Sequence, residues 1–443
     1  EPVAEVESVD AVEAVAETMD TAGKAVLFSG LTVLISLVAV LLVPSPAFRS
    51  MTVGIILSVL FVLAATLTLL PAVLAKLGPR VDRLALPWAR HREHRSPRFA
   101  RWAERLWRHP LAFGGAALLI LVVLTLPVLG LKTGMPSIVV VPQDDHSRIG
   151  YERIVATFGP GAPGAVQVVS PSADSARVRT ALEADSGIAA TLPSNRSQAG
   201  DLTLTEAIPT TDPSTPALGS TVERLRARLP AAALLGGPAV ENHDLEQALE
   251  ARTPLAIGVV LALGFLLLLV AFQAPLLAAI GVLTTLLATG AAFGVAKLLF
   301  QDGHLSGPLG FESQGFLDAW GPVFFFAMIF AISMDYTVFL LASAKEHLDR
   351  SGDPREAAIG GLAHSGRVIL AAAAVMVAVF FTFALSGPLP PKEMGIILGV
   401  AVLLDALLVR LLLVPVALRL AGAAAWWRPS WLHRVLPDVR FGH

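Results

Sequence analysis

Eight long apolar runs constrain this chain more than any other feature of its sequence. A helix needs about 20 mostly apolar residues to cross the hydrocarbon core of a bilayer. Hydrophobic residues make up 54% of the chain and charged residues 15%, against about 25% charged in an ordinary soluble protein. The sequence therefore predicts a polytopic α-helical membrane protein. Its predicted spans are 24–43, 51–75, 110–130, 254–273, 275–300, 320–342, 367–386 and 393–418.

Basic residues predict which side of the membrane each loop occupies. The segment between the second and third spans is rich in arginine, and such loops face the cytoplasm. Alternation from there places residues 343–366 and the C-terminus in the cytoplasm as well, and residues 131–252, 301–319 and 387–392 outside. The predicted segments are a cytoplasmic helical segment (1–23), two spans (24–76), a basic cytoplasmic linker (77–109), one span (110–130), an outer domain (131–252), five spans (253–420) and a cytoplasmic tail (421–443).

The outer domain has a different pattern, with short periodic segments separated by Gly, Pro and Ser. After a helix near 146–157, the predicted order is strand, helix, strand, strand, helix, strand. This order is typical of a ferredoxin-like split βαβ domain. The six elements lie near 165–170, 173–184, 187–192, 202–208, 215–229 and 232–235, and a helix at 242–251 leads into the next span.

An internal repeat relates the two span groups. Residues 54–57 and 395–398 both read Gly-Ile-Ile-Leu, and Leu70-Pro71 corresponds to Val414-Pro415. Both copies run in the same direction through the membrane, so the repeat is parallel, as in many transporters. The first copy lacks spans that the second copy has. We therefore expect the chain to be part of a longer protein that begins upstream of Glu1.

Two acids stand inside predicted spans, Asp335 and Asp405. An acid near the bilayer centre costs about 2.5–3.5 kcal/mol on insertion scales, and such residues usually mark an ion or proton path. The plainer alternative is a polar contact that joins helices. Asp335 can bond Tyr336 or Ser333, and Asp405 can pair with Arg410. Because Arg410 follows Asp405 by five positions, a poor alignment on an α-helix, we expect Arg410 to reach the cytoplasmic interface instead.

Other candidates are weaker. The hydroxyls of Ser29 and Thr32 can be satisfied by carbonyls of their own helix. Lys24, Arg367 and Glu393 lie at span ends, where they are expected to act as anchors. The histidines lack metal-ligand spacing, the chain has no cysteine, and no phosphate-binding Gly-rich loop is present. We therefore expect no metal, no cofactor and no enzymatic activity, and a net charge of −2 argues against a nucleic-acid partner.

The residues around both acids resemble those of MMPL-type transporters in the resistance-nodulation-division (RND) superfamily. The segment Ile332-Ser333-Met334-Asp335-Tyr336 is similar to the family's Asp-Tyr signature, and residues 404–410 followed by Val414-Pro415 are similar to its last span. Phe158-Gly159-Pro160-Gly161 and Gly236-Gly237-Pro238-Ala239 resemble parts of its porter domain. One departure is Leu370, where many relatives carry Thr.

This resemblance implies twelve spans in two parallel halves, each with an outer porter domain. The chain then holds spans five to twelve and the second porter domain of an RND-type bundle. It also implies proton-driven export (proton antiport) of lipids or other hydrophobic molecules, including drug efflux, across the bacterial plasma membrane. Asp335, Tyr336 and Asp405 would relay protons, with a matching Asp-Tyr pair on a span that precedes this chain.

Two other functions remain open. A non-transporting RND-fold protein, such as a sterol-sensing-like receptor or a protein-secretion accessory, would keep the fold without proton coupling. A structural scaffold would tolerate apolar residues at Asp335 and Asp405. The sequence names neither the cargo nor the oligomeric state, and a homo-oligomer is compatible with it.

Overall fold

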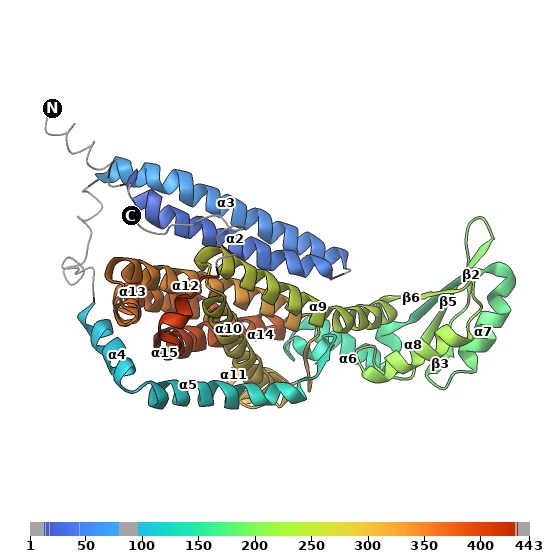
Figure 1. Ribbon diagram of the computed structural model, residues 1–443. Helices are drawn as coiled ribbons and strands as arrows, with labels where there is room; N and C mark the ends of the chain where they lie inside the picture. The colour runs from blue at the N-terminus through green and yellow to red at the C-terminus, as the bar shows by residue number, and fades with distance from the viewer. Residues whose placement is uncertain are drawn as a thin grey trace.

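The computed structural model describes residues 13, 15–16, 18–43, 45–78, 96–429 and 432. It shows a helical bundle with a small α/β domain at one end (Figure 1). Seven helices in this part of the chain are long and apolar enough to cross a membrane. They are α3 (Pro46–Leu77), α5 (Pro110–Thr125) with η5 (Leu126–Gly130), α9 (Pro238–Phe272), α10 (Pro275–Ala296) with η9 (Lys297–Gln301), α12 (Gly321–Ser351), α13 (Pro354–Phe383), and α14 (Leu389–Leu404) continued by η10 (Asp405–Leu413), α15 (Val414–Ala421) and η11 (Gly422–Trp426).

The predicted span at 24–43 is a shorter helix than the other seven. Its residues form α2 (Lys24–Val38) and the 3₁₀ turn η2 (Ala39–Leu42), after the π turn η1 (Met19–Gly23). α2 contacts α3 on one side and α9 and α12 on the other, and the pair α2–α3 lies along one flank of the bundle (Figure 1). Residues 1–12, 79–95 and 433–443 of the predicted cytoplasmic segments lie outside the described residues.

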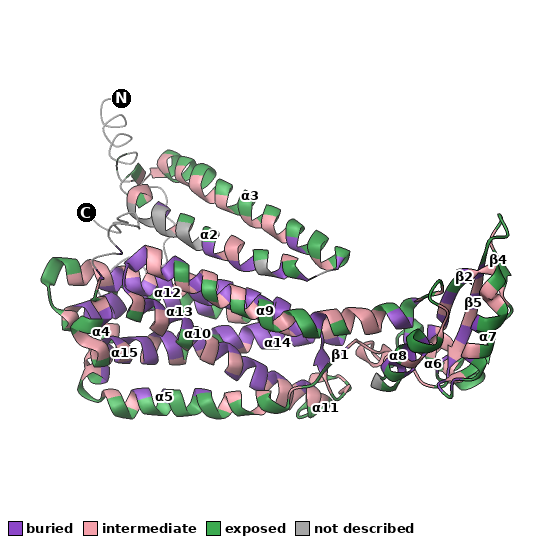
Figure 2. Cartoon of the chain, turned by 45° about the vertical axis from the view of Figure 1, so that its right-hand side comes forward, coloured by how far each residue is buried: buried purple, intermediate pink, exposed green. Residues whose placement is uncertain are grey.

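Helix α12 forms the axis of the bundle. In its most apolar 18-residue window, 72% of the residues are buried, whereas in α3 the value is 0%. The colouring by burial shows the same contrast between the centre and the flank (Figure 2). Small residues let neighbouring helices approach closely, as is usual in membranes: a Cβ at Gly361 of α13 would lie 2.8 Å from the Cα atom of Ala344 in α12. The predicted acid Asp335 thus lies on the central helix.

Three predicted boundaries differ from the structure because the helices run past the apolar runs. The predicted helix 242–251 and the span after it form the single 35-residue helix α9, with Pro254 inside it. The predicted loop 343–366 is mostly the end of α12 and the start of α13. These two helices are separated by Gly352, whose φ of 68° ends α12, and by Asp353, whose side chain caps α13. Polar residues can extend a helix that an apolar window no longer detects.

The loops predicted to share a side of the membrane lie at the same end of the bundle. The helix α4 (Pro97–Arg108), from the basic linker, contacts α13 and α15, and the Ser96 amide donates to the Ala363 carbonyl at 3.0 Å. The α/β domain and α11 (Ser306–Leu309) lie at the opposite end (Figure 1). The structure therefore separates the two predicted groups of loops by the length of the bundle.

The α/β domain confirms the predicted ferredoxin-like order. Its sheet has the strand order β3-β5-β2-β6, and each pairing is antiparallel. Helices α7 and α8 contribute Val178, Leu182, Val222 and Leu225 to its apolar core. The elements are β2 (Val166–Pro171), α7 (Ser175–Glu183), β3 (Ile188–Thr191), β5 (Leu202–Pro209), α8 (Pro216–Arg228) and β6 (Leu234–Gly236), with β4 (Asn195–Arg196) paired to β5.

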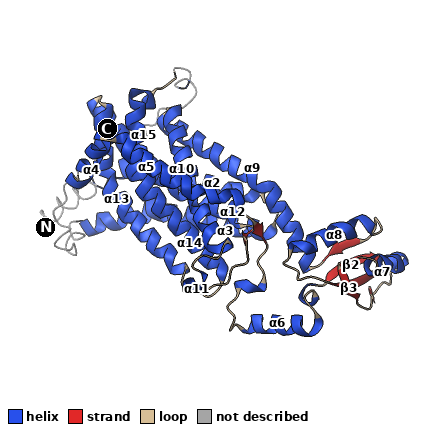
Figure 3. Ribbon diagram, turned by 90° about the horizontal axis from the view of Figure 1, so that it is seen from below, coloured by secondary structure: helices blue, strands red, loops and turns tan. Residues whose placement is uncertain are grey.

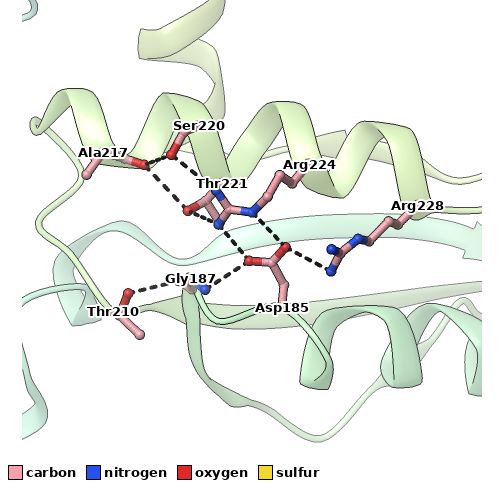
Figure 4. Close-up of polar contacts among 8 residues, drawn as sticks. All are labelled: Asp185, Gly187, Thr210, Ala217, Ser220, Thr221, Arg224 and Arg228. Carbon is pink, nitrogen blue, oxygen red and sulfur yellow. Dashed lines mark hydrogen bonds and ion pairs between the residues drawn. The ribbon is translucent and has the colours of Figure 1, made fainter.

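A buried carboxylate joins α8 to the turn before β3 (Figure 4). Asp185, whose side chain is 0% exposed, accepts hydrogen bonds from Arg224 at 2.8 and 3.1 Å and from the Gly187 amide at 2.9 Å. Arg228 lies 3.4 Å from its other side. These bonds, that from Arg224 first, hold the pKa of Asp185 below its ordinary value. Asp185 is therefore a structural hub of this domain.

A short strand pair connects the α/β domain to the bundle. Strand β1 (Thr133–Gly134) pairs in parallel with β7 (Leu317–Asp318), immediately before α12. Helix α6 (His146–Phe158) then leads into the domain, near the predicted helix. Figure 3 shows how the chain passes from the bundle through α6 to the sheet. The remaining described turns are η6 (Ile138–Val140), η7 (Ala162–Gly164) and η8 (Ser172–Asp174).

Candidate functional site: a buried ion pair in the helical bundle

The π-helical stretch η10 brings Asp405 and Arg410 together. In a π-helix the backbone bonds join residues five apart, so these two side chains share a face. Arg410 Nε donates to Asp405 Oδ2 at 3.1 Å, and Nη2 lies 3.1 Å from Oδ1. Arg410 is 0% exposed and Asp405 1%. The prediction that Arg410 reaches the interface was therefore wrong, because it assumed α-helical geometry.

Arg410 also ties η10 to two other helices. Its Nη2 donates to the carbonyl of Ser333 in α12 at 2.7 Å and lies 3.4 Å from the hydroxyl of Thr285 in α10. Its Nη1 has no hydrogen-bond partner among the described residues. A buried charge is tolerated when it is paired and hydrogen-bonded. Here the Arg410 guanidinium is paired with Asp405, but its Nη1 group makes no hydrogen bond among the described residues. The ion pair is thus held by three helices, but its hydrogen bonding is incomplete.

The π-helical stretch is supported from outside by Trp102. Pro415 has no amide hydrogen, so the carbonyl of Leu411 lacks the donor that an α-helix would supply four residues later. The indole Nε1 of Trp102, in α4, donates to that carbonyl at 3.0 Å. The ring of the neighbouring Trp107 lies 5.2 Å from the Arg419 guanidinium. Helix α4 therefore holds the C-terminal part of η10, one residue beyond Arg410.

Asp335 and Tyr336 lie on α12, close to the ion pair. Both are half-buried, whereas Ser333 and Thr337 on the same helix are fully buried. The Tyr336 hydroxyl lies 3.7 Å from the sulfur of Met376 in α13. Tyr336 is also within electrostatic range of Asp335, Asp405 and Arg410. The three residues predicted to relay protons are therefore neighbours, and Tyr336 interacts with both acids.

The supporting candidates divide into two groups. Ser333 belongs to the site, since its carbonyl accepts from Arg410 and its side chain hydrogen-bonds Asp405. Thr32 is buried on α2, the helix that packs on α12, and its carbonyl accepts from Ser36 at 2.9 Å. The side chain of Ser29 is not among those described. The predicted roles of Thr32 and Ser29 stay predictions.

Sequence reasoning missed two features. Thr285 is fully buried against Arg410, but a threonine inside an apolar run gives no sign of a distant partner. Glu393 was predicted to be an anchor at a span end, yet it is 0% exposed. That prediction was wrong because the chain between α11 and β7 packs against the start of α14, where Lys392 bonds the Leu309 and Gly310 carbonyls and Glu393 faces Asp318. The described residues contain no group of three His, Asp or Glu side chains that could hold a metal.

The fold and site define a class of protein, a multi-pass helical membrane bundle with an outer α/β domain and a buried ion pair in its core. The chain matches the sequence model of the MMPL family over residues 5–113 and 143–438. It belongs to the MMPL family. Together with its apolar helices, this makes it a multi-pass bacterial membrane protein, as predicted.

Individual relatives agree with this membership. The chain is 39% identical over 440 residues to a putative membrane protein of Streptomyces coelicolor, covering 98% of this chain and 60% of that protein. It is 33% identical to the mycolic acid-containing lipids exporter MmpL11 of Mycolicibacterium smegmatis, covering 98% of this chain and 47% of that one. The chain thus spans about half the length of the curated relatives it matches.

Among solved structures, SecDF of Thermus thermophilus, a translocon-associated membrane protein, resembles the chain with 16% identity and a TM-score of 0.47. The match covers 92% of this chain and 50% of that one. A likeness at this level carries no argument about function.

Proposed function

We propose that this chain forms half of a proton-driven exporter of lipids or other hydrophobic molecules across the bacterial plasma membrane. The observation that carries the proposal is the ion pair Asp405–Arg410, held between α10, α12 and η10 in the apolar core. Acids and cations inside membrane helices usually mark ion or proton paths. The name of the M. smegmatis relative, a lipid exporter, supports a hydrophobic cargo.

The site suggests how a proton would act. A proton on Asp405 neutralises the carboxylate and weakens its bonds to Arg410. Arg410 then keeps its contacts with Ser333 in α12 and Thr285 in α10 but loses the carboxylate that orients its guanidinium, so the contacts between η10 and these two helices can rearrange. One proton crossing about 100 mV supplies about 2.3 kcal/mol, comparable to a charge-assisted hydrogen bond of about 1.5–3 kcal/mol. The proton's energy is therefore sufficient to shift this contact.

Asp335 and Tyr336 would pass the proton to this pair. Asp335 is half-buried and Tyr336 interacts electrostatically with both acids, which supports a role for the tyrosine hydroxyl in linking the partly accessible carboxyl to the buried one. In this proposal Asp335 exchanges protons, Tyr336 links the two acids, and Asp405 with Arg410 converts proton binding into helix movement.

The test is export by the complete protein in cells, with its cargo identified by lipid profiling of a deletion strain. Asp335→Asn and Asp405→Asn should each abolish export while the protein is still inserted at normal levels. Asp349→Asn is the matched control, because Asp349 is a 60% exposed acid on the same helix α12. Full export by Asp335→Asn would refute the proposal and would favour a non-transporting RND-fold protein, such as a receptor or secretion accessory.

A further inference from the structure

Two buried carboxyls at the domain-side end of the bundle have no role in the site described above. Asp318 ends strand β7, and Glu393 lies in the second turn of α14. Both are 0% exposed. At about 1.5 Å per residue, Glu393 is about 18 Å along its helix from Asp405. The two carboxyls therefore form a separate place where charge is buried.

Neither carboxyl has a cation to pair with. No cation bonds either carboxyl among the described residues. The neutral donors near them are the Asp318 amide beside Glu393, and the side chains of Gln314, at 3.5 Å from Asp318 Oδ1, and Trp320. The adjacent Lys392 is engaged elsewhere, because its Nζ donates to the carbonyls of Leu309 and Gly310 at 2.6 and 3.0 Å. The pair thus contrasts with Asp405, which has Arg410.

Two such acids cannot both be ionised at low cost. A buried unpaired carboxylate is expensive, and two carboxylates that share a site usually hold one proton between them. Asp318 and Glu393 interact electrostatically. Burial raises the pKa of Asp318 to about 6, although hydrogen bonds from Gln314 and Trp320 oppose this. The chemistry of the pair is therefore that of a proton-binding site.

The pair lies beneath the connection between the bundle and the α/β domain. The amides of Leu317 and Ala319 donate to the carbonyls of Lys132 and Gly134 at 2.9 and 2.8 Å, which forms the β1–β7 ladder. Three residues after Gly134, the Ser137 amide donates a hydrogen bond to the Gln314 side chain at 2.8 Å. Any movement of Asp318 away from Glu393 would thus disturb the ladder that holds residues 132–137.

A cleft lies at the same end of the bundle as the pair, and neither carboxyl lines it. The cleft, of about 350 Å³, lies between the connector, α11 and the start of α14, and Gly310 and Leu389 line it. Gly310, which lines the cleft, accepts a hydrogen bond from Lys392, the residue next to Glu393. Of the other charged groups at this end, Arg148 pairs with Glu312 at 2.7 Å, Lys297 pairs with Asp302 at 2.7 Å, and Lys132 is exposed. None of these groups forms an ion pair with Asp318 or Glu393.

We propose that Asp318 and Glu393 form a proton-binding pair that locks the connector strand β1 onto the bundle while the pair holds a proton. When both acids ionise, their repulsion and the entry of water from the cleft separate β7 from α14 and release the ladder. The ligand is a proton rather than a metal ion, since Ca²⁺ takes six to eight oxygen ligands and the described residues supply no third acid. The inference does not depend on transport.

The sign of the pH effect follows from linkage. A carboxyl whose pKa is about 6 in the locked form and about 3.9 when solvated binds more protons when locked. The locked form therefore gains about tenfold in population per pH unit as pH falls from about 6 to about 4, about 100-fold in all. Above that range, the ladder opens most easily.

Hydrogen exchange measured by mass spectrometry tests this in the complete protein. After correction for intrinsic rates, peptides covering residues 131–137 and 315–320 should gain about 100-fold protection between pH 7 and pH 4. Glu393→Gln, a neutral isostere of the protonated acid, removes one of the two like charges and should raise protection at pH 7 above that of wild type, with a shallower pH profile that reports Asp318 alone. Asp318→Asn should likewise raise protection at pH 7 and leave a shallower profile that reports Glu393, and Asp144→Asn, which alters an exposed acid at the same end, should behave as wild type.

Two results would overturn the inference. One is a pH profile that is unchanged in both Glu393→Gln and Asp318→Asn. The other is protection that follows added CaCl₂ or NaCl at constant pH, which would show a cation site in place of a proton site. Failure of the export test for Asp335 would leave these results unaffected, because the exchange assay does not measure transport.

Discussion

Breaking the ion pair Asp405–Arg410 should cost far more stability than breaking an exposed one. Arg410→Met removes two contacts of 3.1 Å and leaves a carboxyl that is 1% exposed without its counter-charge. Removing one partner of a buried pair costs about 3–5 kcal/mol. Protonating a carboxyl of ordinary pKa at pH 7 costs about 4 kcal/mol, which limits the loss, because the orphaned acid can bind a proton instead.

A double-mutant cycle on the complete protein in detergent measures this. Arg410→Met and Asp405→Leu should each lower the free energy of unfolding by about 3–5 kcal/mol, and the double variant should recover to within about 1–2 kcal/mol of wild type, since an apolar pair replaces the ionic one. The control pair is Lys345–Asp349 on α12, where Asp349 is 60% exposed. Its removal should cost less than about 1 kcal/mol. A loss below about 1 kcal/mol for Arg410→Met would refute the buried pairing.

Three further predictions test other parts of the structure. Asp185→Ala should lower the free energy of unfolding of the α/β domain by about 2 kcal/mol in chemical denaturation. Because the pKa of Asp185 is lowered in the folded domain, this contribution should be present above pH 4 and vanish as pH falls below it. Equal stability of wild type and Asp185→Ala at pH 7 would contradict the structural role of Asp185. Gly294→Ala should reduce thermal stability, since its Cβ would meet the Leu124 carbonyl; an unchanged melting temperature would show that α5 can move aside. The chain has no cysteine, so a single introduced cysteine reports its side of the membrane. Gln198→Cys should react with an impermeant maleimide in intact cells, whereas Ser351→Cys should react only after the cells are permeabilised. The reverse pattern would show that the proposed topology is inverted.

Much of the fold follows from local sequence patterns. Apolar runs located the spans because length and hydropathy are properties of a segment by itself. The strand order of the α/β domain followed from the ferredoxin-like sequence of elements, and β3-β5-β2-β6 confirmed it. Helix ends were less predictable, because polar turns such as those at the end of α12 continue a helix beyond its apolar part.

The site was predicted in part. Asp335, Tyr336 and Asp405 stood out because ionisable residues in apolar runs are rare, and the structure places them near one another. The pairing of Asp405 with Arg410 was considered but disfavoured, because it depends on the π-helical geometry of η10, which the residue spacing does not reveal. The partners Thr285 and Trp102 come from distant helices, and their contacts arise from tertiary packing alone. Glu393 was missed because position at a span end does not determine burial.

Proton flux in proteoliposomes tests the central claim most directly. The complete protein would be reconstituted with a pH dye inside, and a pH gradient imposed in the presence of its lipid cargo. The account predicts a cargo-stimulated proton flux in wild type and in Asp349→Asn, and loss of that flux in Asp335→Asn. Proton flux in Asp335→Asn equal to that of wild type would contradict it.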